Sequence, residues 1–302
     1  MNRWYRHRYH TPLSHRLVFG IIPHVPRALH PPIAVVTSLI FMALLRRERR
    51  AVRANVEAIG RARGVRAWWT TFQVFYSFCD FMVGYCYIPR ADDGGLLAML
   101  SSSDRGQEAI ERCLAGGHGL IAWTAHLGNW ELASRLLELH GRPVHVARAL
   151  EAGNEAETML RALMDNGRLR VVDVNDPLAA VELLNALRAN EIVAVQGDRA
   201  FSDRAIELPF FGRPARFPAG PFVLSYYSGA PVLPCLAVRT GWLKYRMVPA
   251  EPIVPDRSLD VDRAVREGLE RAVGFLEAQL RHHHAQWLNF YDFWGVSSEG
   301  RR

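Results

Sequence analysis

The stretch Gly119-Leu-Ile-Ala-Trp-Thr-Ala125 is followed at once by His126-Leu-Gly-Asn-Trp-Glu131. The first part is short and apolar, which is typical of a buried strand. Asn129-Trp-Glu then opens a helix that runs to Leu139, with leucines along one side. His126 therefore follows the carboxyl end of a strand, where open α/β sheets place their functional sites.

Strands and helices alternate through the chain after about residue 105. We expect further strands over residues 144–150, 169–174, 192–196, 231–238 and 243–248. We expect further helices over residues 154–166, 177–188, 220–227 and 259–280, with a loop rich in Pro and Gly before residue 220. The alternation predicts an α/β fold with a mainly parallel mixed sheet flanked by helices, which we assign to residues 101–302.

The beginning of the chain has a different composition. Residues 1–67 contain thirteen arginines and only two acidic residues, although the 302-residue chain has a net charge of just +7. Residues 33–45 are uncharged and mostly apolar, and Arg46-Arg-Glu-Arg-Arg50 follows directly. Residues 68–87 include nine aromatic side chains. We predict that residues 1–100 form a helical region that associates with a membrane.

A span of the bilayer needs about twenty apolar residues, so we expect this region to lie on the membrane rather than cross it. Two alternatives stay open: a crossing helix that also uses residues 17–30, and two ordinary core helices. Binding of nucleic acid by the arginines is a third, which the interleaved apolar runs disfavour.

His126 and Glu131 are the first candidates for chemistry. If the turn folds the ring back, Glu131 can accept the Nδ1 proton and leave Nε2 as a base. The motif contains no serine or cysteine, so the nucleophile is expected to be a hydroxyl of the substrate. The chain also lacks the motifs of dinucleotide enzymes, P-loop proteins, serine hydrolases and HExxH metalloproteases. The structural alternative is a loop-capping histidine beside a glutamate that complements the helix dipole.

Several blocks resemble the bacterial lysophospholipid acyltransferase superfamily, and the lipid A late acyltransferases within it. Besides His126–Glu131, the similar blocks are Arg49–Asn55, Leu187–Asp198, Leu208–Ala215, Phe217–Gly220 and Gly229–Pro234. The chain departs from that pattern at its end, where Gln286-Trp-Leu-Asn-Phe-Tyr-Asp-Phe-Trp294 looks like a less studied branch.

The resemblance implies an O-acyltransferase at the cytoplasmic face of the inner membrane. The acyl chain would come from acyl carrier protein or coenzyme A and pass to a hydroxyl of a lipid or glycolipid. His126 and Glu131 would be catalytic, and no metal or redox cofactor is implied. The expected substrate-binding residues are Asn129, Asp198, Arg199, Arg216 and Gly220. For the two arginines, structural ion pairs with Asp198 or Glu207 are an equal alternative.

Two other functions remain open at this point. The chain can be a lipid-binding protein with an inactive site on the same fold. It can also transfer acyl groups in a pathway of the aryl-polyene or fatty-acid type rather than to lipid A.

Overall fold

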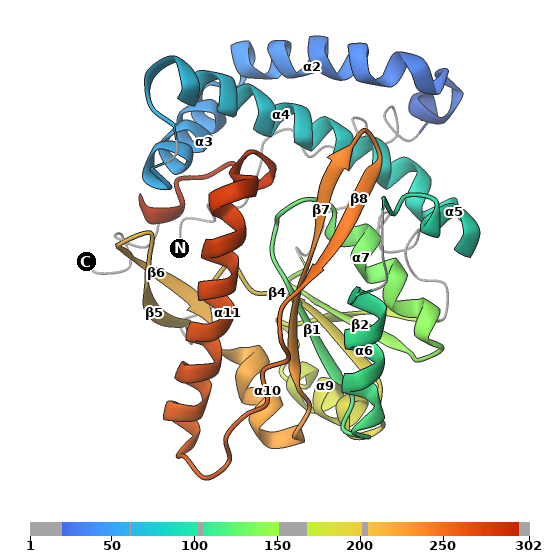
Figure 1. Ribbon diagram of the computed structural model, residues 1–302, viewed down its shortest axis with the longest axis vertical. Helices are drawn as coiled ribbons and strands as arrows, with labels where there is room; N and C mark the ends of the chain where they lie inside the picture. Colours follow the sequence, from blue (N-terminus) through green and yellow to red (C-terminus); the bar gives the residue numbers. More distant parts are fainter. Residues whose placement is uncertain (1–19, 61, 102–104, 151–167, 201–204, 296–302) are drawn as a thin grey trace.

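A six-stranded sheet forms the centre of the molecule (Figure 1). The computed structural model describes residues 20–60, 62–101, 105–150, 168–200 and 205–295. In spatial order the strands are β3 (Leu169–Asp173), β2 (Val144–Arg148), β4 (Ile192–Gln196), β1 (Leu120–Thr124), β7 (Val232–Gly241) and β8 (Lys244–Pro249). The first five are parallel, and β8 is antiparallel to β7. The predicted mainly parallel mixed sheet is confirmed.

Helices cover both faces of this sheet. One face packs against α6 (Arg105–Ala115) and α7 (Trp130–Leu137), and the other against α9 (Ala179–Arg188), α10 (Gly220–Ser228) and α11 (Val261–His283). Strand β1 contributes to both cores, because successive side chains of a strand point to opposite faces. Leu120 lies in the first core, whereas Ile121 and Trp123 lie in the second. The helix expected over residues 154–166 lies outside the described residues.

The N-terminal helices stack over one end of the sheet. They are α2 (His30–Leu44), α3 (Arg46–Ala58), α4 (Gly64–Tyr87) and the short α5 (Asp93–Leu97). Figure 1 shows α4 running across the end of the sheet at which the parallel strands finish, with α2 lying over α4. Helix α4 therefore separates α2 from the carboxyl ends of β1 and β4.

The prediction of a loop before residue 220 is wrong for residues 205–218. They form an antiparallel ribbon of β5 (Ala205–Phe210) and β6 (Arg213–Pro218), separate from the main sheet. Phe211 and Gly212, which join the strands, both have positive φ, as a tight hairpin turn requires. Phe210 and Phe217 are fully buried and pack on the C-terminal aromatic residues. The prolines in this stretch led us to predict a loop, because proline within a sheet is confined to edge strands, strand starts and bulges.

Gly128 fixes the turn that follows β1. Its φ is +69°, and a Cβ there would lie 1.9 Å from the carbonyl oxygen of Ala237 in β7. Its N–H donates to the carbonyl of Gln286 at 3.0 Å, and the next N–H, of Asn129, donates to that of Ala237 at 2.9 Å. The turn is thus held between β7 and the C-terminal segment.

We expect Gly128→Ala to cost far more stability than Gly141→Ala. Gly141 has a similar φ of +67° but open space around it, so alanine there pays only the conformational cost of about 1–2 kcal/mol. At Gly128 the overlap with Ala237 adds roughly 1–3 kcal/mol or more. Denaturant unfolding of both variants measures the difference. Equal losses would show that the close approach to β7 is not a constraint.

Candidate functional site

His126 and Asp198 meet at the carboxyl ends of two neighbouring strands. His126 follows β1 by two residues, and Asp198 follows β4 by two residues. Because β1 and β4 pair in parallel, the two positions emerge side by side. Nδ1 of His126 lies 2.7 Å from Oδ1 of Asp198, and both residues are buried. The sequence named both residues, but it did not pair them.

Glu131 does not contact Nδ1 of His126, so that part of the prediction is corrected. Its Oε1 accepts hydrogen bonds from Arg148 Nη2 at 2.5 Å and from the indole N–H of Trp130 at 3.0 Å. Glu131 stands in the first turn of α7, and Arg148 ends β2. The charge of the buried Glu131 carboxylate is thus balanced by the guanidinium of Arg148 on β2. This ion pair keeps the pKa of Arg148 above its usual value.

The surroundings of the pair set its protonation at neutral pH. Burial, followed by the charge of Arg199, lowers the pKa of His126 to about 4 in spite of the carboxylate beside it. Burial alone would raise the pKa of Asp198, but the imidazole, Arg199 and the indole of Trp287 bring it below its usual value. The pair therefore holds a neutral imidazole and an ionised carboxylate.

In this state Nδ1 carries the proton and donates it to Asp198, because a carboxylate only accepts. The opposite nitrogen, Nε2, then has a free lone pair and can act as a base. A buried carboxylate that fixes the tautomer and stabilises the imidazolium plays the part of the third member of a serine triad.

Two residues that contact Asp198 escaped the sequence analysis. The indole N–H of Trp287 donates to its Oδ2 at 2.9 Å, and Nδ2 of Asn289 donates to the same oxygen at 3.3 Å. Both belong to the C-terminal segment that departs from the lipid A acyltransferase pattern. That departure was the available signal, although we interpreted it as a feature of the branch rather than of the site.

Arg199 is engaged by the same C-terminal segment. Its Nε donates to Oδ1 of Asn289 at 2.7 Å, and its Nη2 donates to the carbonyl of Leu288 at 3.0 Å. Its guanidinium carbon lies 5.6 Å from the centroid of the Tyr291 ring. These contacts favour the structural alternative for Arg199, with partners other than those we expected.

The remaining predicted residues have separate positions. Asn129 is the N-cap of α7, and its Oδ1 accepts the N–H of Leu132 at 3.0 Å. Arg216 lies on β6, directly across the ribbon from Glu207. Gly220 is the exposed first residue of α10. In the described part of the chain, no hydrogen bond joins the side chain of Asn129 or Arg216 to His126 or Asp198, and Gly220 has no side chain. The substrate-binding roles of all three residues therefore stay predictions.

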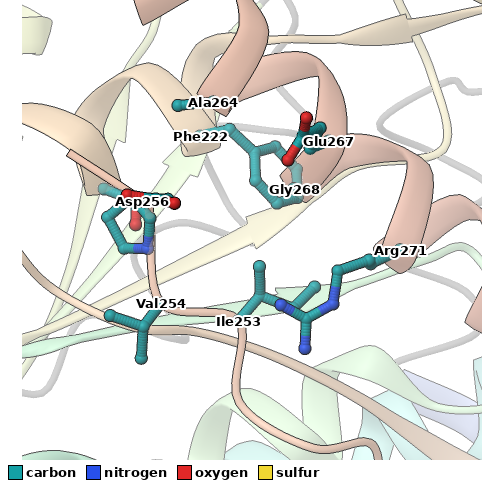
Figure 2. A pocket seen from close by; sticks show the side chains of 10 residues that line it. Phe222, Ile253, Val254, Asp256, Ala264, Glu267, Gly268 and Arg271 are labelled. Carbon is teal, nitrogen blue, oxygen red and sulfur yellow. The ribbon is translucent and has the colours of Figure 1, made fainter. Parts of the chain in front are cut away.

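In the described ranges, no group of three His, Cys, Asp or Glu side chains is placed to hold a metal ion. A small pocket of about 90 Å³ lies between α10, α11 and residues 253–256 (Figure 2). Its Ile253 pairs with Val232 at the start of β7, whereas His126 follows the finishing end of the adjacent β1. The pocket is therefore remote from the His126–Asp198 pair.

The sequence is similar to those of known acyltransferases. A phosphatidylinositol mannoside acyltransferase of Mycobacterium tuberculosis is 26% identical over 210 residues, covering 67% of this chain and 65% of the relative. A protein of the same description from Mycolicibacterium smegmatis is 27% identical over 164 residues, covering 51% and 52%. The chain thus matches just under two thirds of the length of the first of these relatives.

The model of the bacterial lipid A biosynthesis acyltransferases matches residues 19–294, which include every described element and the His126–Asp198 pair. With nearly the whole chain matched, the protein belongs to the bacterial lipid A biosynthesis acyltransferase family.

Proposed function

We propose that this protein transfers an acyl chain from a thioester to a hydroxyl group of a membrane lipid or glycolipid. The donor is acyl carrier protein or coenzyme A, and the reaction takes place at the cytoplasmic face of the inner membrane. The observation that carries the proposal is the 2.7 Å hydrogen bond that holds the His126 imidazole against Asp198. Two further findings support the proposal: the chain belongs to a family of lipid A biosynthesis acyltransferases, and the relatives are named as phosphatidylinositol mannoside acyltransferases.

In this mechanism Nε2 of His126 takes the proton of the acceptor hydroxyl as its oxygen attacks the thioester carbonyl carbon. Asp198 stabilises the imidazolium that forms. When the tetrahedral intermediate collapses, the carbon–sulfur bond breaks and the departing thiolate receives the proton from Nε2. His126 is thus base and then acid, and it returns to its neutral form.

Two contacts between aromatic rings connect α4 with the site and support a lipid as acceptor. The Phe81 ring of α4 lies 4.2 Å from that of Trp130, which lies 4.9 Å from the His126 imidazole, centroid to centroid. Trp130, packed against Phe81 of α4, therefore forms an apolar wall next to the base. Such a wall suits a substrate that carries hydrocarbon chains.

The outer side of α2 and the first turns of α4 form the surface that we assign to the membrane, here called the apolar face. Its exposed large side chains are Ile33, Val35, Val36, Leu39, Ile40 and Leu44 on α2, and Val65, Trp68 and Trp69 on α4. Exposed apolar side chains gathered in this way mark protein or membrane contacts. The exposed arginines 46, 47 and 50 begin directly after α2, and their charge favours anionic lipid head groups.

In this proposal helix α2 lies along the membrane surface. By length and composition, residues Arg27–Leu44 are the one helical stretch in the described chain apolar enough to cross a bilayer. Its α-helical part has 15 residues, about 22 Å at 1.5 Å per residue, against a hydrocarbon core of about 30 Å. The inner side of α2, with Ala34 and Ser38, is buried and α2 packs on α4. A crossing would require that packing to break.

We expect His126→Ala to lower kcat/KM by roughly 10²–10⁴-fold, the usual contribution of a general base. Release of free thiol from acyl-coenzyme A or acyl carrier protein, with a lipid extract as acceptor, measures the rate. The control is His118→Ala, which removes an exposed histidine just before β1. A His126→Ala protein that works at the wild-type rate would contradict the proposed function.

The same assay gives the pH dependence of the base. Because the base must be neutral, kcat/KM falls only as pH drops through the lowered pKa of His126. The acid limb of the profile is therefore expected below 6.5, the ordinary value for imidazole. A limb at or above that value would show that His126 is not buried beside Arg199 as described.

We expect the triple variant Val36→Gln, Ile40→Gln and Leu44→Gln to bind anionic vesicles more than ~10-fold less tightly. Burying such side chains is worth ~1.5–3 kcal/mol each, so even partial insertion yields this loss. The matched control changes Val174, Leu178 and Val181 to Gln. These residues are similarly exposed but lie just after β3, at the N-cap of α9 and on α9, respectively. Equal binding by both triple variants in vesicle co-sedimentation would exclude the apolar face as the membrane-binding surface.

A further inference from the structure

Asp198 needs more partners than His126 alone can supply. The residue has no exposed surface, and its two oxygens are used differently. Oδ1 faces the imidazole, and Oδ2 accepts from the Trp287 indole at 2.9 Å and from the Asn289 amide at 3.3 Å. An ionised carboxylate out of contact with water is stable only when donors of this kind surround it.

Both donors come from a segment that is fastened to the turn carrying the base. The N–H of Leu288, which lies between them, donates to the carbonyl of His126 itself at 2.7 Å. Gln286 accepts the N–H of Gly128 at 3.0 Å. The positions of Trp287 and Asn289 relative to His126 are thus set by backbone hydrogen bonds on both sides of Trp287.

Arg199 fixes the orientation of the Asn289 amide. The guanidinium only donates, so the atom that faces its Nε at 2.7 Å must be the amide oxygen. The amide NH₂ group therefore turns toward Asp198. Arg199 also binds the carbonyl of Leu288 at 3.0 Å, which holds the segment from the same side.

Asn55 of α3 holds the segment from the other side. Its Nδ2 donates to the carbonyls of Asn289 at 3.1 Å and Tyr291 at 2.8 Å, and its Oδ1 accepts the N–H of Phe293 at 3.0 Å. All of its side-chain hydrogen bonds go to the backbone of one short stretch. Trp287 and Asn289 are therefore presented to Asp198 by a rigid support.

We propose that Trp287 and Asn289 are positioning residues that hold Asp198 in the orientation His126 needs for acyl transfer. This inference rests on the proposed function, because it assigns the two residues a task in the same site. Neither residue touches the reacting atoms, since both act through the far oxygen of the carboxylate.

Loss of the indole donor has two consequences. The carboxylate becomes free to rotate away from Nδ1, so the imidazolium is less well stabilised as it forms and kcat falls more than KM. The negative charge on Asp198 is also less dispersed, so the His126–Asp198 pair takes up a proton more readily. The acid limb of kcat/KM then moves to higher pH.

The test is Trp287→Phe, which keeps an aromatic ring and removes the N–H. We expect kcat to fall roughly tenfold, in line with the loss of a hydrogen bond to a charged group, with KM little changed and the acid limb at higher pH. In an Asp198→Asn background, the same substitution is expected to have almost no further effect on kcat, because the two residues act as one unit.

Trp294→Phe is the matched control. Trp294 is also buried in the C-terminal aromatic cluster, 6.1 Å from Trp287 between ring centroids, and its indole N–H has no hydrogen-bond partner in the described chain. We expect this variant to keep the wild-type pH profile even if its melting temperature drops. Asn289→Ala, with the expected loss in kcat and the same direction of pH shift, serves if Trp287→Phe fails to fold.

Equal effects of the two tryptophan substitutions, with the acid limb unmoved in both, would overturn the inference and leave Trp287 as a packing residue. A full further loss in the Asp198→Asn background would do the same. The proposed function fails separately, if His126→Ala keeps the wild-type rate.

Discussion

The hydrogen bond between His126 and the buried, ionised Asp198 is the constraint on which the site depends. A carboxylate without exposed surface must be surrounded by donors, and here they come from His126 after β1 and from the C-terminal segment. The chain has to bring these pieces within hydrogen-bonding distance of one another. Two glycines permit it: Gly128, pressed against Ala237, and Gly197, where a Cβ would lie 1.8 Å from the Trp123 indole nitrogen.

Sequence alone predicted most of the sheet, because strands β1, β4 and β7 are short apolar runs between helices of clear period. It also placed His126 and Asp198 at strand ends. It paired His126 with Glu131, which is five residues away, because local spacing is all that a single sequence shows. The true partner is 72 residues away along the chain and becomes adjacent only through the parallel pairing of β1 with β4.

Two other differences have related physical causes. The β5–β6 ribbon carries prolines that indicate a loop, yet the burial of Phe210 and Phe217 against the C-terminal aromatic residues stabilises it. From its position after Asp198 we predicted that Arg199 binds substrate, but its N–H groups instead donate to Asn289 and Leu288. In both cases the deciding partner is the segment at residues 287–294, whose contacts span the chain from Asn55 to Asp198. Contacts of this range leave no periodic signal in a sequence.

We conclude that Asp198, and not Glu131, accepts the hydrogen bond from Nδ1–H of His126. Proton NMR of the protein labelled with ¹⁵N-histidine tests it directly, because a ring N–H donated to a buried carboxylate is strongly deshielded and exchanges slowly. We expect such a signal from His126 at neutral pH, retained in Glu131→Gln and lost in Asp198→Asn. A signal that survives in Asp198→Asn and disappears in Glu131→Gln would contradict the pairing of His126 with Asp198.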